Sequence, residues 1–163
     1  MSNLTQSVGA YTATYKGVDI GTFEGALRQN QTMHAQDVRA SRFGDTVIDG
    51  VYRGSNVFQV ATIKEWTEAI RDTIWPFDEE LGNTGIHGRL LTDIAGALVL
   101  TAVPGTPAVT LGPATRTYSL AVLAPEHNAE VTFGTEERNM PIVFRCYPAI
   151  TVATTVAVHY VDT

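Results

Sequence analysis

The sequence predicts a mainly β protein with one amphipathic α-helix packed on a sheet. Short apolar segments, rich in Val, Thr, Tyr, Phe and Ile, mostly alternate with polar residues, as in strands that are buried on one face. Turn residues such as Lys16-Gly17, Asp49-Gly50 and Arg53-Gly54-Ser55-Asn56 separate these segments. One stretch, about residues 64–75, has helical periodicity instead.

The strands are assigned from these alternating segments and from the turns between them. We expect the last segment to be broken near its middle. The expected strands are Val8–Tyr15, Gly25–Val38, Asp45–Tyr52, Asn56–Ile63, Arg89–Asp93, Ala97–Val103, Thr117–Ala124, Ala129–Phe133, Pro141–Tyr147 and Thr151–Val161.

The predicted helix has signals at both of its ends. Thr62 and Glu65 stand three residues apart, as in a capping box that satisfies two free N–H groups. Pro76 disfavours helical geometry at Trp75 and therefore ends the helix there. We expect the apolar face to pack on a sheet. That face consists of Trp66, Ala69, Ile70 and Ile74.

Composition limits the classes of protein to consider. The chain of 163 residues has the size of a single domain, residues 1–163, and its 17 acidic and 11 basic side chains give a net charge of -6. Such a chain is a poor candidate for gripping nucleic acid through phosphates. Charged residues are only 17%, against about 25% in typical soluble domains, which is a first hint of self-association. With no apolar run near the ~20 residues of a membrane span and no secretory signal, we expect synthesis in the cytoplasm and no membrane partner.

No catalytic, cofactor-binding or metal-binding motif is found in the sequence. The four histidines are scattered singly, so no zinc site is expected. Asp45 and Asp49, four residues apart on a strand, would lie about 13 Å from each other, too far to share a proton. Cys146 alternates with Phe144 and is expected to be a buried small hydrophobe. We therefore expect that the protein is not an enzyme.

The segment from Leu27 to Gln36 is unusually polar for a strand. Neither of its alternating faces is apolar enough for the core of a sandwich. Two interpretations remain open. One side can face a water-filled lumen while the other meets a neighbouring chain, or the segment can be part of an exposed edge hairpin.

Two blocks of the sequence follow a distinctive order. The first runs from Gly17 to Gly25, through the polar strand, to Phe43–Gly54 and then Val57–Trp66. The second is Arg138–Pro148. The order is an opening strand bounded by glycines, a polar hairpin, a strand leading into one helix, and a late strand with a proline close behind. This order resembles the major tail tube proteins of tailed bacteriophages, and from the first block to the second the resemblance spans most of the chain.

The resemblance implies a structural subunit of a viral tail. Such proteins fold as an antiparallel β-sandwich with one flanking α-helix and assemble into homo-hexameric rings. The rings stack into a tube whose hairpins form one continuous inter-subunit β-barrel around an electronegative lumen. The tube houses the tape measure protein and conducts double-stranded DNA to the host without binding it specifically. The implied partners are therefore other copies of the chain, the tape measure protein, the tail terminator, and distal tail or baseplate proteins. The implied location is the virion tail.

Carried onto this chain, the resemblance makes the polar hairpin, about residues 25–52, the wall of the lumen, with a tip loop from Arg39 to Asp45. The segment 103–114 does not match the family pattern. The lumen-facing candidates are Gln29, Gln31, Asp37, Asp45 and Asp49. The candidates for inter-ring or inter-subunit contact are Arg39, Arg42, Phe43 and Arg53.

Two alternatives stay open. One is a β-sandwich that binds a carbohydrate or a receptor through a platform of exposed aromatic side chains. The other is a subunit of a related injection or secretion tube. The platform would consist of Trp66, Trp75, Tyr52 and Tyr118.

Overall fold

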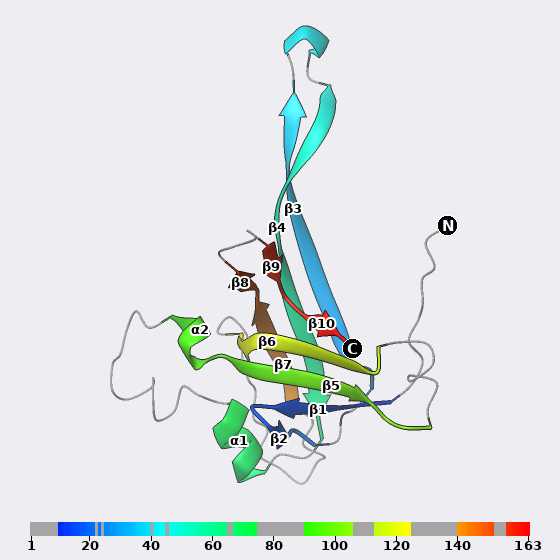
Figure 1. Ribbon diagram of the computed structural model, residues 1–163, viewed down its shortest axis with the longest axis vertical. Coiled ribbons are helices and arrows are strands. Elements are labelled where there is room, and N and C mark those ends of the chain that lie inside the picture. Colours follow the sequence, from blue (N-terminus) through cyan, green and yellow to red (C-terminus); the bar gives the residue numbers. More distant parts are fainter. Residues whose placement is uncertain are drawn as a thin grey trace.

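The protein is mainly β and antiparallel, as the sequence predicts (Figure 1). The computed structural model describes residues 10–21, 23, 25–39, 41–44, 46–64, 67–74, 90–105, 113–124, 140–151 and 156–163. The strands are β1 (Tyr11–Tyr15), β2 (Val18–Asp19), β3 (Arg28–Arg39), β4 (Val47–Ile63), β5 (Gly96–Ala102), β6 (Thr115–Leu123), β7 (Met140–Tyr147), β8 (Ala149–Thr151), β9 (Val156–Val158) and β10 (Val161–Asp162). The helices are η1 (Ser41–Phe43), α1 (Glu68–Ile74) and α2 (Leu91–Ile94).

Eight of these strands form a single sheet. Seven of them follow the order β2-β1-β5-β6-β7-β4-β3, and the eighth, β10, also pairs with β6. The strands β8 and β9 form a separate two-stranded ribbon. The sheet curls strongly. The ring of Tyr15 on β1 lies 4.9 Å from the ring of Phe144 on β7, although β5 and β6 lie between these strands in the sheet. The Tyr15 hydroxyl also donates to the Ala121 carbonyl on β6 at 3.0 Å. The core therefore fills the concave side.

Strict alternation builds this core. On β4, Val57, Gln59, Ala61 and Ile63 are buried while the residues between them are half-buried, and β7 alternates in the same way. Cys146 shares the buried side with Phe144, as predicted. We call the buried side of the sheet the core face and the opposite side the outer face.

The helix α1 begins later than the capping-box pattern predicts. Thr62 lies in β4, where it pairs with Pro141, so it cannot cap a helix. The Thr67 hydroxyl instead accepts the Ile70 N–H at 3.2 Å, and the helix begins at Glu68. Ile70 and Ile74 are buried as predicted, but Ala69 is exposed, because the later start leaves a helix of seven residues with a narrow apolar face.

The strand predicted at Arg89–Asp93 is wrong. Residues 91–94 form the single-turn helix α2, in which the Asp93 N–H donates to the Leu90 carbonyl at 3.0 Å. One helical turn buries Ile94 while Thr92 and Asp93 remain exposed. A continuous strand would also place Ile94 and Asp93 on opposite faces, but it would not turn the chain into β5.

The two strands predicted at Asp45–Tyr52 and Asn56–Ile63 are one strand, β4, of 17 residues. The turns predicted at Asp49-Gly50 and at Arg53-Gly54 are therefore wrong. Gly54 has a φ of 121°, and the pairing with β3 shifts by one residue next to it, so that the glycine serves a β-bulge within a continuous strand.

The predicted break in the last strand and the predicted turn after β1 are both present. Thr151–Val161 is broken, with β8 ending at Thr151 and β9 and β10 following. The Lys16-Gly17 turn joins β1 to β2, and both of its residues have a positive φ. The predicted strand Ala129–Phe133, together with Trp66, Trp75 and Asp45, lies outside the described residues.

Candidate functional site

The hairpin of β3 and β4 projects from the rest of the molecule as a long arm (Figure 1). We define the arm as residues 31–56, because the pairing of β4 with β7 begins only at Val57. We call the rest of the described chain the body, and the end of the hairpin that joins it the arm base. Ten residues of β4 lie in the arm, and at about 3.4 Å per residue they span roughly 34 Å. Nearly all described residues of the arm are exposed. The exceptions are Val38, Gly54, Ser55 and Asn56, which are half-buried.

Both edges of the arm are open. Within the described strands, β3 pairs only with β4, and residues 47–56 of β4 pair only with β3. An isolated two-stranded ribbon is marginally stable in water. Its unpaired N–H and C=O groups form a ready template for another strand. The arm is therefore a surface suited to strand pairing with another chain.

The arm also exposes large apolar side chains. The exposed fraction is 72% for Met33 and 61% for Tyr52. Val47, Ile48 and Val51 are about half exposed. An accumulation of apolar side chains on one element indicates an interaction surface, whereas single exposed ones do not.

Pairing with β4 assigns each residue of β3 to a face. Gln31 stands opposite the buried Val57, so it continues the core face, whereas Thr32 stands opposite Asn56 on the outer face. Alternation then extends both rows along the strand. The core-face row of β3 is Gln29, Gln31, Met33, Ala35, Asp37 and Arg39, and the outer-face row is Arg28, Asn30, Thr32, His34, Gln36 and Val38.

A polar network fixes the base of the arm to the body. Gln29 Oε1 accepts hydrogen bonds from Arg116 Nη1 at 2.9 Å and from the Tyr118 hydroxyl at 2.6 Å. Arg116 also makes two bonds to the Asp162 carboxylate, at 2.6 and 2.7 Å, and its guanidinium stacks 4.3 Å from the Tyr160 ring. Gln29, a predicted lumen residue, is thus half-buried at the arm base.

The electrostatics of this network favour its bonded form. The hydrogen bond to Asp162 raises the pKa of Arg116, so the guanidinium stays charged. Burial raises the pKa of Tyr118, so its hydroxyl keeps the proton that it donates. The alternation of Arg116 with Tyr118 is the signal that would have placed them on one face. Their partners at Gln29 and Asp162 are distant in sequence and leave no local signal.

The outer face at the arm base has a different chemistry. The Arg145 guanidinium lies 5.2 Å from the Tyr147 ring and 5.8 Å from the Phe58 ring. Asn56 Nδ2 donates to His34 Nε2 at 3.1 Å. The segments 25–36, 54–64 and 140–151 contain no Asp or Glu. This part of the surface is therefore made of amides, hydroxyls, aromatic rings and arginines.

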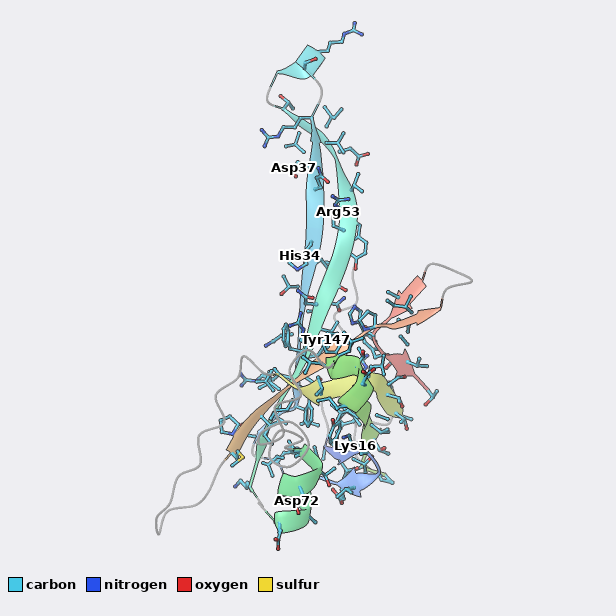
Figure 2. All side chains as sticks on the ribbon, turned by 90° about the vertical axis from the view of Figure 1, so that its left-hand side faces the viewer. Lys16, His34, Asp37, Arg53, Asp72 and Tyr147 are labelled. Atoms are coloured by element: carbon cyan, nitrogen blue, oxygen red, sulfur yellow. The ribbon has the colours of Figure 1, made fainter. Side chains whose placement is uncertain are left out.

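Further along the arm, charges of both signs occur. Asp37 and Arg39 form an exposed ion pair at 3.6 Å, and Asp49 accepts the N–H of Gly50 at 2.7 Å. Figure 2 shows Asp37 and Arg53 on the two strands of the arm. Gln31 and Arg53 are exposed on the two strands, and Arg42 is exposed at the tip. Asp45 and the Phe43 side chain lie outside the described part of the chain. In sequence, residues 31–56 contain three carboxylates and three arginines, so the arm carries no net charge.

The described residues hold no group of three or more His, Cys, Asp or Glu side chains that could bind a metal ion. Cys146 is buried, and burial raises the pKa of its thiol to about 12, so it is unreactive at neutral pH. Of the described members of the predicted aromatic platform, Tyr118 is fully buried in the body, so it cannot belong to an exposed platform, and Tyr52 lies on the arm. No helix in the described ranges is long and apolar enough to cross a membrane.

Comparison with known proteins does not assign the chain to a family. No protein-family model matches the chain, and no curated protein matches it.

Proposed function

We propose that this protein is a structural subunit of a bacteriophage tail tube, which forms stacked homo-hexameric rings around a lumen that houses the tape measure protein and conducts DNA to the host. The observation that carries the proposal is the hairpin arm, with two open edges and exposed apolar side chains. The open edges of the arm can pair with further strands, and the arms of other copies of the chain supply such strands.

The geometry of the hairpin supports pairing between copies. Because β3 and β4 run in opposite directions, arms that lie side by side and point the same way bring β3 of one copy next to β4 of the next, again antiparallel. Each contact joins unlike edges, so it repeats around an axis, and it closes into a ring where the rotation between copies divides a full turn. A closed barrel of arms leaves no free edge.

The finer features of the predicted fold belong to this proposal. The body of each subunit would form the two layers of the β-sandwich outside the barrel, with α1 beside it. The tip of the arm, with Arg39, Arg42 and Phe43, would reach the neighbouring ring, and Arg53 would contact the next subunit. The tail terminator and the distal tail or baseplate proteins would bind the two ends of the tube in the virion.

Removal of the arm tests the proposal. Met33 and Ser55 stand opposite each other in the ladder, so an Asn-Gly pair in place of residues 34–54 would close a two-residue hairpin turn between them. None of the described residues within 34–54 belongs to the hydrophobic core cluster. We expect the wild-type protein to form rings or hollow tubes in negative-stain micrographs, and the shortened protein to remain a folded monomer.

A matched control is Thr92→Ala, an exposed substitution on α2, which should leave tube formation unchanged. Discrete wild-type monomers at high protein concentration, or tubes formed by the shortened protein, would contradict the proposal. A subunit of a related injection or secretion tube would use its arm in the same way. Duplex DNA inside particles isolated from the native source would distinguish the phage tube from that alternative.

A further inference from the structure

We infer that the bore of this tube is lined by the outer face of the hairpin, through Arg28, Asn30, Thr32, His34 and Gln36, and that the opposite row of β3 packs against protein. This inference rests on the proposed function and specifies which surface of the subunit meets the contents of the tube. It moves Gln29, Gln31 and Asp37 away from the lumen. Asp49 stays on the lumen side, since it pairs with Val38.

The first argument is the position of the body. At the arm base, the core face of β4 is covered by the body, and Val57, Gln59 and Ala61 are buried there. Gln29, in the same row as Gln31, is bonded to the body through Arg116. A barrel of paired arms with an open lumen has no room inside it for the bodies of the subunits as well. The bodies must therefore lie outside the barrel, and the outer face of the sheet must look toward its axis.

The second argument is the polarity of the arm above its base. The core-face row contains Met33 and Ala35, and Tyr52 and Val47 of β4 lie opposite residues of this row. All four are exposed in the isolated subunit. The outer-face row over the same stretch of β3 is Thr32, His34, Gln36 and Val38. Water can solvate the first three, and Val38 and Val51 are the apolar members of this face of the arm. The polar members of the core-face row are Gln31, Asp37 and Arg39. Apolar burial favours covering the first row with a neighbouring copy.

The consequence is a bore whose wall at the arm base differs from the acidic wall that the family resemblance implies. Arg28 is exposed there, and no carboxylate lies in segments 25–36, 54–64 or 140–151. A polyanionic thread would meet amides, hydroxyls and guanidinium groups at this level. The carboxylate of Asp49 lies nearer the tip.

Cysteine labelling of assembled tubes tests which row faces the bore. The single native cysteine, Cys146, is only 2% exposed, so it adds little background. Thr32→Cys and Gln31→Cys place one exposed thiol on neighbouring residues of opposite faces. Each variant is treated with N-ethylmaleimide and with a maleimide coupled to a folded protein wider than the bore, both as tubes and as dissociated subunits.

We expect the Thr32→Cys tubes to react with N-ethylmaleimide but to react with the bulky reagent at least tenfold more slowly than dissociated subunits do. Gln31→Cys tubes should be protected from both reagents. Two results would overturn the inference. One is that Gln31→Cys tubes react with N-ethylmaleimide but not with the bulky reagent. The other is that Thr32→Cys tubes react with the bulky reagent as fast as dissociated subunits do. If either variant fails to assemble, Gln36→Cys and Ala35→Cys give the same comparison. A wild-type protein without tubes would instead refute the proposed function.

Discussion

Cys146 sits in the middle of the core, and its burial has a consequence for stability at high pH. Burial raises the pKa of the thiol from its ordinary 9.0 to about 12. Tyr15 behaves similarly, with its pKa raised from 10.0 to about 12. Both groups remain protonated in the folded chain while the unfolded chain ionises. The stability that they contribute is thus complete below about pH 9 and is lost as the pH rises toward 12.

We therefore expect ionisation of the thiol in the unfolded chain to lower the free energy of unfolding by about 1 kcal/mol between pH 9 and pH 10, with a smaller loss from the tyrosine over the same interval. Cys146→Ala should show a correspondingly shallower decline over this interval, although its stability at pH 8 is lower because the side chain is smaller. Urea unfolding at pH 8, 9 and 10 measures both slopes. Equal slopes for the two proteins would exclude the thiol as the cause.

Single side chains also connect elements that the sequence keeps far apart. Gln29, Arg116 and Asp162 join β3, β6 and β10 in one network. Sequence patterns predicted the polar character of Gln29 but not its partners, because hydrogen bonds between distant strands leave no periodic signal. Local alternation, by contrast, was enough to predict that Cys146 and Phe144 are buried on one face.

At the scale of elements, α1 owes its start to one hydroxyl. The Thr67 side chain caps the helix by accepting the Ile70 N–H. Thr67→Ala should lower the free energy of unfolding by about 1 kcal/mol, since it leaves this N–H without its side-chain acceptor. Urea unfolding measures the loss.

The matched control is Thr73→Ala, in the last turn of the same helix, where the hydroxyl donates to the Ala69 carbonyl at 2.7 Å. That change should stay within about 0.5 kcal/mol of the wild type, because alanine also has the higher helix propensity. Equal losses in the two variants would show that the Thr67 contact does not cap the helix.

The errors in element prediction have a common physical cause. The Gly50 and Gly54 pairs look like turns, because glycine in a polar dipeptide is the strongest local turn signal. Pairing with β3 overrides that signal and keeps β4 continuous, with bulges taking up the irregularities. Thr62 was assigned to a cap for a similar reason, since its pairing with Pro141 on β7 cannot be read from neighbouring residues.

At the scale of the whole molecule, the assignment of the core-face row to a neighbouring copy and of the outer-face row to the bore predicts how assembly responds to added charge. Met33→Asp and Gln36→Asp each place one carboxylate on an exposed position of β3. We expect Met33→Asp to abolish tubes, because its carboxylate would be buried against a neighbouring copy. Gln36→Asp should still assemble, because its carboxylate would face water in the bore.

Negative stain and sedimentation of the assembled protein measure this difference, while thermal unfolding of the dissociated subunits serves as the control. Both positions are exposed, so the stability of the subunits should stay within about 0.5 kcal/mol of the wild type. Tubes from both variants, or from Met33→Asp alone, would contradict the assignment of the two rows.

The arm projects from one end of the molecule only, while α1 lies toward the other end (Figure 1). A filament built by stacking such subunits in one orientation is directional. One terminus would expose the tips of the arms, and the other would expose the end of the body that carries α1. Because the two termini differ in chemistry, ending the filament at each of them would call for a different capping factor.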